Sequence, residues 1–394
     1  MCWPADDADL LATLARLRGA GVLPVVLWQA FAAVSSRLMQ VRAALVGPGP
    51  HPVHVIGGPH ASAEPEACAW AGFDLVAAGE GEVTMRLLAD ALDAGRDPRE
   101  VDGLGHLGPA GYRPSPGRAV EALDDVPSFA MRQRRIGPIE ITRGCVYACR
   151  FCHTPYVFRA AFRHRSVPSV LEHVRWMLSL GKRHVRFLTP TAMSYGATAV
   201  APDLDAAERL LAAVRTELPP DGRVYFGTFP SEIRPEHATR EALTLVTRWA
   251  DNDNVIIGAQ SGSDAVLGAA HRGHDVASVR AAVSNCASVG LTANVDIICG
   301  MPGETDNDVQ ATLDLCRDLV ADGARIHPHT FLPLPGTPWR DMPPGRVAPA
   351  VRAQVAELTS RGQAYGSWER QQEVARTLAE LPSHRVRPRR ARPS

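Results

Sequence analysis

The sequence has no excess of charge of either sign and no long apolar run. Its 394 residues include 42 basic and 42 acidic side chains. A chain without net charge has no overall field that would attract nucleic acid, a membrane surface or a polyanionic substrate. No apolar run approaches the roughly eighteen residues of a membrane helix, and the N-terminus lacks the basic stretch and apolar core of a signal peptide. We therefore expect a globular, cytoplasmic protein.

Cysteine is sparse, and most of the cysteines lie far apart along the chain. The chain has eight cysteines, and without a secretory signal we expect no disulfide framework. We interpret five of them as core or surface thiols: Cys2, Cys68, Cys286, Cys299 and Cys316. The other three lie within eight residues of one another, at Cys145, Cys149 and Cys152.

The spacing C-x3-C-x2-C indicates a metal cluster. An iron-sulfur cube takes one thiolate per iron, so a loop that supplies three leaves one iron open to a ligand from outside the protein. A structural zinc site is the first alternative, but zinc usually takes its four ligands from two C-x2-4-C pairs, and the sequence has no second pair. His153 or the distant Cys299 could supply a fourth ligand, although neither has the usual spacing. The second alternative is three packing thiols, which are normally scattered through cores.

Short apolar segments alternate with helical periodicities in residues 1–100. This alternation predicts a parallel sheet with helices on both faces, a Rossmann-like α/β domain in which glycines at strand ends let a ligand approach the backbone. The alternative is that these glycines make tight strand-to-helix turns and nothing more. The expected strands cover residues 23–28, 53–56 and 74–78, and the expected helices cover 9–18, 35–46, 64–70 and 83–94.

Glycine and proline are frequent in residues 101–136. We interpret this segment as a linker, with room for a hairpin, between two domains.

A second alternation of strands and helices fills residues 137–340. Six strand-helix units predict a partial (β/α)6 barrel of the TIM type, which places reactive groups at the C-terminal ends of its strands. The expected strands are 139–142, 183–188, 224–229, 255–259, 293–298 and 326–331, and the expected helices are 167–180, 203–218, 235–250, 275–289 and 305–321.

The ends of these expected strands are rich in polar residues. For any one of them a turn or a helix cap is the simpler explanation, and Ser263 and Thr305 have the pattern of N-caps. Together they would converge on one rim of the barrel. Glu232, His327, His329 and Tyr195 are candidates for a general acid or base by position, and the sequence leaves the catalytic residue open.

The cysteine loop resembles that of the radical S-adenosylmethionine superfamily, in which an aromatic residue, here Phe151, directly precedes the last cysteine. In that superfamily S-adenosylmethionine chelates the open iron, and an electron from the cube cleaves it to methionine and a 5′-deoxyadenosyl radical. The resemblance implies a 4Fe-4S cluster on Cys145, Cys149 and Cys152, and a TIM-type barrel.

Two later segments extend this resemblance. Residues 260–264 and 296–305 are similar to the fourth-strand and fifth-strand segments of methylthiotransferases and of B12-type radical enzymes. The second strand departs from the superfamily's frequent Gly-Gly-Glu, so hydroxyl and carbonyl groups would share in binding the amine. The resemblance implies that Thr189 and Thr191 lie near the methionine amino group, Ser231 and Glu232 near the ribose, Gln260 and Ser261 near the carboxylate, and Phe151 and Gly300 beside the adenine.

The N-terminal glycine motifs resemble the cobalamin-binding domain that precedes the core of B12-type radical enzymes. Such a domain usually has five parallel strands, whereas this sequence predicts three, and it has no counterpart of the D-x-H-x-x-G loop. Many radical relatives bind cobalamin without that histidine. The alternative is a shortened domain that only buttresses the core. The implied cobalamin residues are Gly57, Gly58, Pro59, His60, Gly79, Glu80, Gly81 and Glu82.

These resemblances imply an enzyme that takes a methyl group from methylcobalamin and transfers it to an unactivated carbon, or a phosphinate phosphorus, of a small molecule or peptide. The first alternative is a radical rearrangement, dehydrogenation or ring closure without cobalamin. A methylthiotransferase is disfavoured, because only Cys2 and Cys68 precede the core and the pattern after it is helical. A non-catalytic iron-sulfur or zinc protein would leave the polar rim unexplained.

The implied partners are the substrate and a low-potential electron donor of the flavodoxin or ferredoxin type, and we expect neither nucleic acid nor a membrane. The pattern of residues 341–383 predicts helices that cover the open side of the barrel or help to shape the substrate pocket. Residues 384–394 hold five arginines and predict a disordered tail.

Overall fold

The structure is a computed structural model that describes residues 6–20, 24–31, 52–115, 117, 119–158 and 160–380. The chain divides into two compact units, one containing residues up to Val120 and the other formed by Glu121–Ala379. The expected helix at 35–46, the expected tail at 384–394 and Cys2 lie outside the described residues. Among the helices that the structure describes, none is long and apolar enough to cross a membrane.

The first unit is built on a mixed sheet in the order β1-β2-β3-β4-β5. Its strands are β1 (Val25–Gln29), β2 (Val53–Gly57), β3 (Leu75–Ala77), β4 (Leu104–Gly108) and β5 (Gly111–Arg113). The first three pair in parallel, while β4 pairs antiparallel with both β3 and β5. The hairpin of β4 and β5 falls inside residues 101–136, so this part of the expected linker belongs to the sheet.

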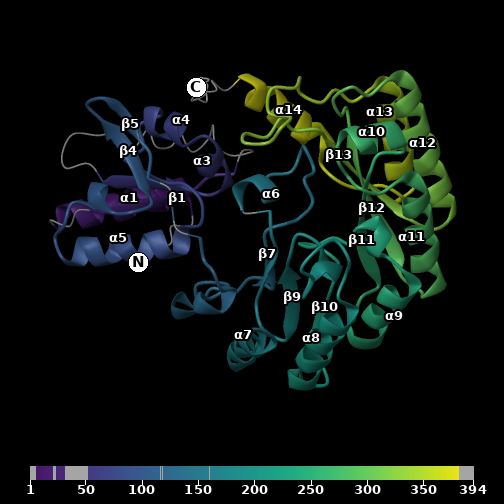
Figure 1. Ribbon diagram of the computed structural model, residues 1–394, viewed down its shortest axis with the longest axis horizontal. Helices are drawn as coiled ribbons and strands as arrows, with labels where there is room; N and C mark the ends of the chain where they lie inside the picture. Colours follow the sequence, from purple (N-terminus) through teal and green to yellow (C-terminus); the bar gives the residue numbers. More distant parts are fainter. Residues whose placement is uncertain are drawn as a thin grey trace, which may run out of the picture. The chain divides into compact units, whose positions relative to one another are not determined.

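Helices cover both faces of this sheet (Figure 1). They are α1 (Asp7–Gly19), α3 (Pro59–Ala63), α4 (Pro65–Trp70) and α5 (Gly81–Asp93). Because successive strand residues point to opposite faces, Val55 of β2 packs in the same cluster as Leu88 of α5, and Ile56 packs with Ala61 of α3 and Cys68 of α4. The expected helix at 64–70 is preceded by α3, since Pro59 is suited to the first turn of a helix.

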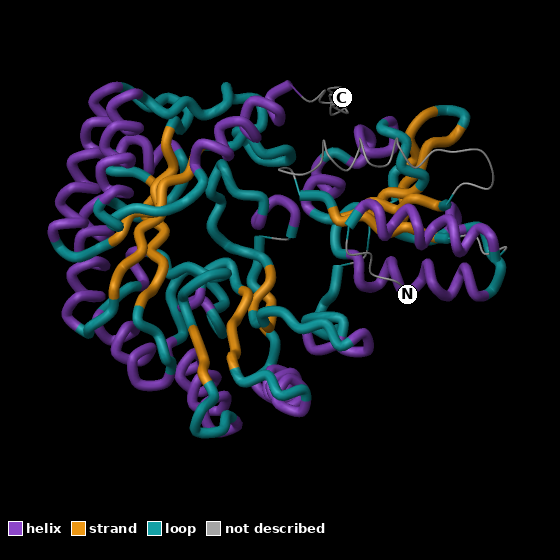
Figure 2. The backbone as a smooth tube through the Cα atoms, turned by 180° about the vertical axis from the view of Figure 1, so that it is seen from behind, coloured by secondary structure: helices purple, strands orange, loops and turns teal. Residues whose placement is uncertain are grey.

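The second unit is an open barrel of mainly parallel strands (Figures 1 and 2). Its strands are β6 (Ile139–Glu140), β7 (Thr142–Arg143), β8 (Arg163–His164), β9 (His184–Leu188), β10 (Arg223–Tyr225), β11 (Asn254–Gln260), β12 (Thr292–Cys299) and β13 (Arg325–Thr330). Parallel sheets run in the orders β10-β9-β6 and β11-β12-β13. A parallel bridge between Ile233 and Ile257 connects the two sheets. This is the partial barrel that the sequence predicts.

Two of the predicted barrel strands differ from those observed. The first, at 139–142, is divided into β6 and β7, and β7 pairs antiparallel with β8. The third was expected to reach residue 229, but β10 ends at Tyr225, shortly before Gly227 takes a φ of 70° that turns the chain.

Helices cover the outside of the barrel (Figure 2). Val295 and Ile297 of β12 and Ile326 of β13 belong to the large core cluster that these helices share. Ser263 and Thr305 cap α10 and α12, as their positions in the sequence predict. The helices are α6 (Thr154–Val157), α7 (Val167–Ser179), α8 (Leu204–Glu217), α9 (Arg240–Trp249), α10 (Asp264–Ala269), α11 (Val276–Ser288) and α12 (Asp306–Ala321), with 3-10 turns at Pro98–Glu100, Leu123–Asp125, Met131–Gln133, Ala192–Ser194 and Pro235–His237.

The segment after the last barrel strand lies along its free edge. It holds α13 (Pro349–Ser360) and α14 (Trp368–Glu380). Between them, Tyr365 N–H donates to Ile326 O at 3.1 Å, and Ile326 N–H donates to Gln363 O at 2.9 Å. The segment therefore covers the edge of β13, on the open side of the barrel.

Two glycines near the end of β11 make a matched test of this packing. A Cβ on Gly262 would lie 2.5 Å from Thr312 Cα and 2.6 Å from Ala311 O in α12. We expect Gly262→Ala to lower the free energy of unfolding by about 1–3 kcal/mol, because the strand end and α12 must separate. Gly268, in α10, has nothing within 4 Å of an added Cβ. There alanine should stabilise the protein by about 0.5–1 kcal/mol. Urea unfolding, followed by circular dichroism, measures the change in the free energy of unfolding for both variants. Changes of the same sign would contradict the close packing of Gly262 against α12.

Candidate functional site

The three clustered cysteines lie on the loop between β7 and α6. Gly144 enters this loop with a φ of 82°, and Cys152 N–H donates to Cys149 O at 3.1 Å. All three are free thiols, with Cys145 and Cys149 buried and Cys152 partly buried. Burial raises the pKa of Cys145 to about 11, and the nearby Cys152 and Cys149 contribute to this rise. The loop therefore places all three thiols in buried or partly buried positions.

A buried arginine contacts this loop from the turn after α10. Arg272 is 3% exposed, and its Nη1 donates to Cys149 Sγ at 3.4 Å. Its Nη2 donates to Gly258 O at 2.6 Å and lies 3.9 Å from Glu232 Oε1. No local pattern in the sequence marks Arg272 as buried.

A second buried arginine braces the same loop. The Cζ of Arg234 lies 3.6 Å from the ring centroid of Tyr147, which is inside the cysteine loop. Arg234 Nη2 also donates to Arg272 O. The hydroxyl of Tyr147 donates to Val200 O at 2.9 Å. Stacking of a guanidinium on an aromatic ring fixes both groups, so the loop is held from two sides.

The other ligands considered for a metal are engaged elsewhere. The Nε2 of His153 lies 2.5 Å from Pro335 O, where it donates a hydrogen bond. Cys299 packs in the large core cluster with Cys316 of α12. Neither contact directs a ligand atom toward the three thiols.

The expected S-adenosylmethionine residues follow the C-terminal ends of the barrel strands, but their hydroxyls differ in what they contact. Thr189 Oγ1 donates to Thr191 O at 3.0 Å, and Ser231 Oγ donates to Phe187 O at 2.8 Å. Ser261 Oγ lies 3.4 Å from Thr312 Oγ1 of α12. The Oγ1 of Thr191 is buried and has no hydrogen-bond partner among the described residues. Of these four hydroxyls, that of Thr191 is the one without a hydrogen-bond partner among the described residues.

Glu232 and Gln260 lie where two strands end. Burial raises the pKa of Glu232, and the nearby Arg272 opposes this rise. Gln260 is buried and takes a φ of 76°, at an irregularity in the pairing of β11 with β12. A left-handed backbone is uncommon for a residue other than glycine and often marks a functional position.

Phe151 and Gly300 lie near the end of β12. Phe151 packs with Ile298, Met301 and Trp339 in a small apolar cluster. Gly300 takes a φ of 75°, and a Cβ there would lie 2.6 Å from Arg346 N. Glycine is therefore required where the loop that contains Arg346 crosses the strand end.

The two glycine motifs of the first unit meet at the C-terminal edge of its parallel strands. Ser62 Oγ donates to Gly58 O at 2.8 Å and accepts from Gly79 N–H at 2.8 Å, so it joins the motifs. A Cβ on Gly58 would lie 2.9 Å from Ala30 O, whereas Gly79 and Gly81 have nothing within 4 Å of an added Cβ. These two glycines thus leave open space at the strand ends.

The remaining cobalamin candidates flank this edge. Gly57 ends β2, Pro59 and His60 form the first turn of α3, and His60 is buried. Glu80 precedes α5 and accepts a hydrogen bond from Val120 N–H at 2.9 Å, while Glu82 lies in the first turn of that helix.

The structure distinguishes between the candidates for a general acid or base. Tyr195 is buried, its hydroxyl donates to Arg165 O at 2.8 Å, and burial raises its pKa to about 12. It therefore serves the packing of the chain. Asp296 of β12 and His327 and His329 of β13 bring their polar atoms within 4.8 Å of one another. Sequence reasoning named the two histidines but missed Asp296, which the register of two strands places beside them.

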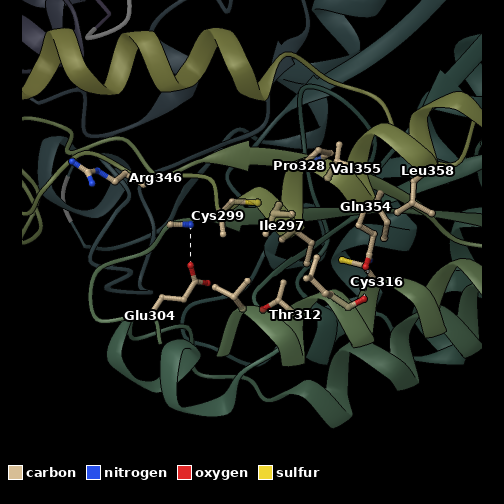
Figure 3. A pocket seen from close by; sticks show the side chains of 16 residues that line it. Ile297, Cys299, Glu304, Thr312, Cys316, Pro328, Arg346, Gln354, Val355 and Leu358 are labelled. Carbon is tan, nitrogen blue, oxygen red and sulfur yellow. Dashed lines mark hydrogen bonds between the residues drawn. The ribbon is translucent and has the colours of Figure 1, made fainter. Parts of the chain in front are cut away.

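A small cavity lies between β12, β13, α12 and α13, on the helix side of the barrel wall (Figure 3). Its volume of about 30 Å³ has room for one or two waters. Figure 3 shows Glu304 beside it, where the carboxylate accepts a hydrogen bond from Gly300 N–H at 3.0 Å. This contact closes the turn after β12. The cavity is too small for a substrate.

Glu304 makes stability depend on pH. Burial raises its pKa from 4.5 to about 7, despite the hydrogen bond from Gly300. Between these values the folded state holds a proton that the unfolded chain releases, so this group's contribution to stability falls as pH rises. We expect Glu304→Gln to gain roughly 2 kcal/mol relative to the wild type from pH 5 to pH 8. Urea unfolding at both pH values measures this gain. The exposed Glu357→Gln is the control, and a constant difference for Glu304→Gln would contradict the raised pKa.

The sequence of the barrel matches a known family. Residues 139–316 match the model of the Radical SAM superfamily. The chain is 31% identical over 252 residues to tRNA-2-methylthio-N(6)-dimethylallyladenosine synthase of Halorhodospira halophila, which covers 61% of this chain and 50% of that protein. It is 26% identical over 299 residues to an uncharacterized methyltransferase of Pyrococcus horikoshii, covering 72% of this chain and 61% of that protein. The chain spans about half the length of the methylthio synthases it matches.

Solved structures resemble the fold over most of the chain. The radical S-adenosylmethionine methyltransferase TsrM of Kitasatospora setae, bound to tryptophan and a SAM analog, has a TM-score of 0.62 and 18% identity, and the match covers 84% of this chain and 67% of TsrM. The cobalamin-dependent S-adenosylmethionine radical enzyme OxsB has a TM-score of 0.62 and 17% identity, with 79% of this chain and 45% of OxsB covered. At such identities the likeness concerns the fold. Within the second unit, residues 139–316 are therefore similar to the radical SAM superfamily in sequence as well as in fold.

Proposed function

We propose that this protein is a radical S-adenosylmethionine enzyme that methylates an unactivated carbon of a small molecule or peptide with the help of cobalamin. The cysteine loop carries the proposal: its three thiols are buried or partly buried, and the buried Arg272 donates to Cys149 Sγ at 3.4 Å. A 4Fe-4S cluster bound by Cys145, Cys149 and Cys152 would supply the electron that cleaves S-adenosylmethionine to methionine and a 5′-deoxyadenosyl radical.

The donor set fits an iron-sulfur cluster with an open iron better than zinc. A structural zinc site is closed by a fourth protein ligand. The ring of His153 is bonded to Pro335 O, and Cys299 packs in the core. Three cysteines on one loop, one of them hydrogen-bonded to the buried Arg272, match a cube whose remaining iron takes an external ligand.

The residues proposed to bind S-adenosylmethionine have unequal support from their contacts. The buried Oγ1 of Thr191 lacks a partner among the described residues, so a ligand amine could satisfy it. Glu232 lies in the barrel near Arg272, where a carboxylate could accept hydrogen bonds from ribose hydroxyls. For Thr189, Gln260, Ser261 and Gly300 the support is their place at or just after strand ends. Ser231 lies in the segment after β10, and Phe151 lies in the cysteine loop, packed against the cluster that holds Met301.

The first unit is proposed to hold cobalamin at the edge formed by residues 57–60 and 79–82. Open α/β sheets bind ligands at the C-terminal ends of their strands. The two motifs meet there through Ser62, and Gly79 and Gly81 leave space in front of them. We assign residues 1–100 together with the hairpin of β4 and β5 to this domain, the rest of 101–136 to a linker, 137–340 to the radical core and 341–383 to the helical extension.

Methylthiotransferase activity is the alternative that the sequence relatives favour. Those enzymes carry a further cysteine-containing N-terminal domain, and a second cluster needs several thiolates. Here Cys68 is buried in α4, and burial raises its pKa to about 12. Such a thiol is suited to packing rather than to cluster binding. We favour methyl transfer because of the open strand ends of the first unit, with a radical rearrangement or dehydrogenation as the alternative without cobalamin. A flavodoxin or ferredoxin type of donor would supply the electron.

The cluster assignment predicts the effect of one cysteine. After anaerobic reconstitution, dithionite and S-adenosylmethionine should yield 5′-deoxyadenosine, and Cys145→Ala should abolish this product because a cluster ligand is missing. The matched control is Cys286→Ala, which removes a buried thiol of α11. Liquid chromatography measures the product. If Cys145→Ala retained the cleavage of the wild type, the assignment of the cluster to this loop would be wrong.

The cobalamin assignment predicts retention of hydroxocobalamin. The full-length protein should keep it through gel filtration, with the visible absorption of the cofactor as the readout. Gly81→Leu should abolish retention because the side chain fills the open space at the strand ends. Gly19→Leu, at the end of α1, also has nothing within 4 Å and is the control. Loss of cobalamin by the wild type would favour the radical reaction without methyl transfer.

A further inference from the structure

The barrel contains a carboxylate and two histidines that the proposed function leaves unused. Val295 and Ile297 of β12 and Ile326 of β13 face the helices, so the alternate residues Asp296, His327 and His329 face the interior of the barrel. Their side chains are 15%, 26% and 27% exposed. Asp296 and His329 also lie close enough to Glu232 for their charges to affect its pKa.

The hydrogen bonds of Asp296 determine which nitrogen of His327 holds a proton. The Nδ1 of His327 lies 2.9 Å from Asp296 Oδ1. Although burial raises the pKa of Asp296, hydrogen bonds from His327 and His329 outweigh it and hold the pKa below its ordinary value. An ionised carboxylate only accepts hydrogen bonds. His327 therefore donates from Nδ1, and the Nε2 of its neutral ring carries a lone pair.

His329 is held in the other tautomer. Thr330 N–H donates to Gln371 Oε1 at 2.8 Å, which orients the amide of Gln371. Its amino group then lies 3.0 Å from His329 Nδ1 and donates to it. Neutral His329 must carry its proton on Nε2, which lies 3.5 Å from Asp296 Oδ1. The two imidazoles thus have opposite tautomers around one carboxylate.

These tautomers argue against a metal at the three residues. A histidine that binds a metal through Nε2 normally donates its Nδ1–H to an acceptor. Gln371 instead presents a donor to His329 Nδ1. Metal binding would require the amide to turn and would leave Thr330 N–H without its acceptor. The network fits a site for protons better than a site for a cation.

The free nitrogen of His327 is accessible within the barrel. Its Nε2 has no hydrogen-bond partner among the described residues, and the ring stacks on Tyr365 at 4.5 Å between centroids and 8° between planes. Gly366 keeps the space beside it, because a Cβ there would lie 3.0 Å from Nε2 and 2.7 Å from Cδ2. Stacking therefore fixes the ring of His327, while the lone pair on its Nε2 remains available to accept a proton.

We propose that His327 accepts a proton from a hydroxyl or N–H group of the substrate, with Asp296 as the residue that positions it. The proton forms a bond to Nε2 as the O–H or N–H bond of the substrate breaks, and the electron pair remains on the substrate atom. The carboxylate of Asp296 stabilises the imidazolium, which returns the proton to water after the product leaves. The proposal rests on the proposed function in one respect, which is the reaction that follows this proton transfer.

Diethyl pyrocarbonate tests this directly, because it acylates an unprotonated and accessible imidazole nitrogen. The full-length protein with its reconstituted cluster is treated near neutral pH, and peptide mass spectrometry reads the rate at each histidine. His327 should react several-fold faster than His329. Asp296→Asn should slow His327 several-fold because the carboxylate that favours the free Nε2 is lost. Asp318→Asn, which removes an exposed carboxylate on α12, should leave both rates unchanged. Gly366→Ala is a second variant and should also protect His327.

Three results would overturn the proposal: faster reaction at His329, an unchanged rate at His327 in Asp296→Asn, or protection of both histidines that a chelator relieves. The last would show a bound metal. A wild type that gives the expected reactivity but produces no 5′-deoxyadenosine would contradict the proposed function and leave the proton acceptor standing. A wild type that produces 5′-deoxyadenosine but lacks the expected reactivity at His327 would contradict the proton acceptor and leave the proposed function standing.

Discussion

A buried cation links the parts of the barrel on which the candidate site depends. Burying a guanidinium is costly unless its charge and its donors are matched. Arg272 meets this requirement with three partners from separate segments: Cys149 of the cysteine loop, Gly258 of β11 and Glu232 after β10. The turn that carries it is formed by His271 and Gly273, both with positive φ. Because each partner compensates the same charge, the loop and the strand ends are coupled.

Arg234 extends this coupling through the backbone. It donates to Arg272 O and stacks on Tyr147, so both buried arginines contact the cysteine loop and are linked to each other. The loop itself has few regular elements, with the short α6 following it. Side chains from distant segments therefore supply the order that its own backbone lacks.

The sequence predicts the scaffold well because its signals are local. Apolar segments locate the barrel strands, and caps such as Ser263 and Thr305 locate helix starts. The spacing of the cysteines is equally local. Arg272 escapes such reasoning because its partner Cys149 is 123 residues away in sequence. Asp296 escapes it because its pairing with His327 depends on the register of β12 and β13.

The predicted S-adenosylmethionine site also depends on contacts between segments that are distant in the sequence. Strand order places Ser231 and Ser261 at the rim, but their hydroxyls contact Phe187 O and Thr312. Whether a rim residue is available to a ligand depends on contacts that a strand pattern does not encode. The linker at 101–136 illustrates this too, since its hairpin becomes part of a sheet only through pairing with β3.

The central claim is that the cysteine loop binds an iron-sulfur cluster with one iron left open for S-adenosylmethionine. Mössbauer spectroscopy of the full-length protein, reconstituted with ⁵⁷Fe, tests this most directly. Adding S-adenosylmethionine should change the isomer shift of a single iron site, because only the iron without a thiolate gains new ligands. A spectrum that stays unchanged with S-adenosylmethionine, or a protein that binds zinc in place of iron, would contradict the claim.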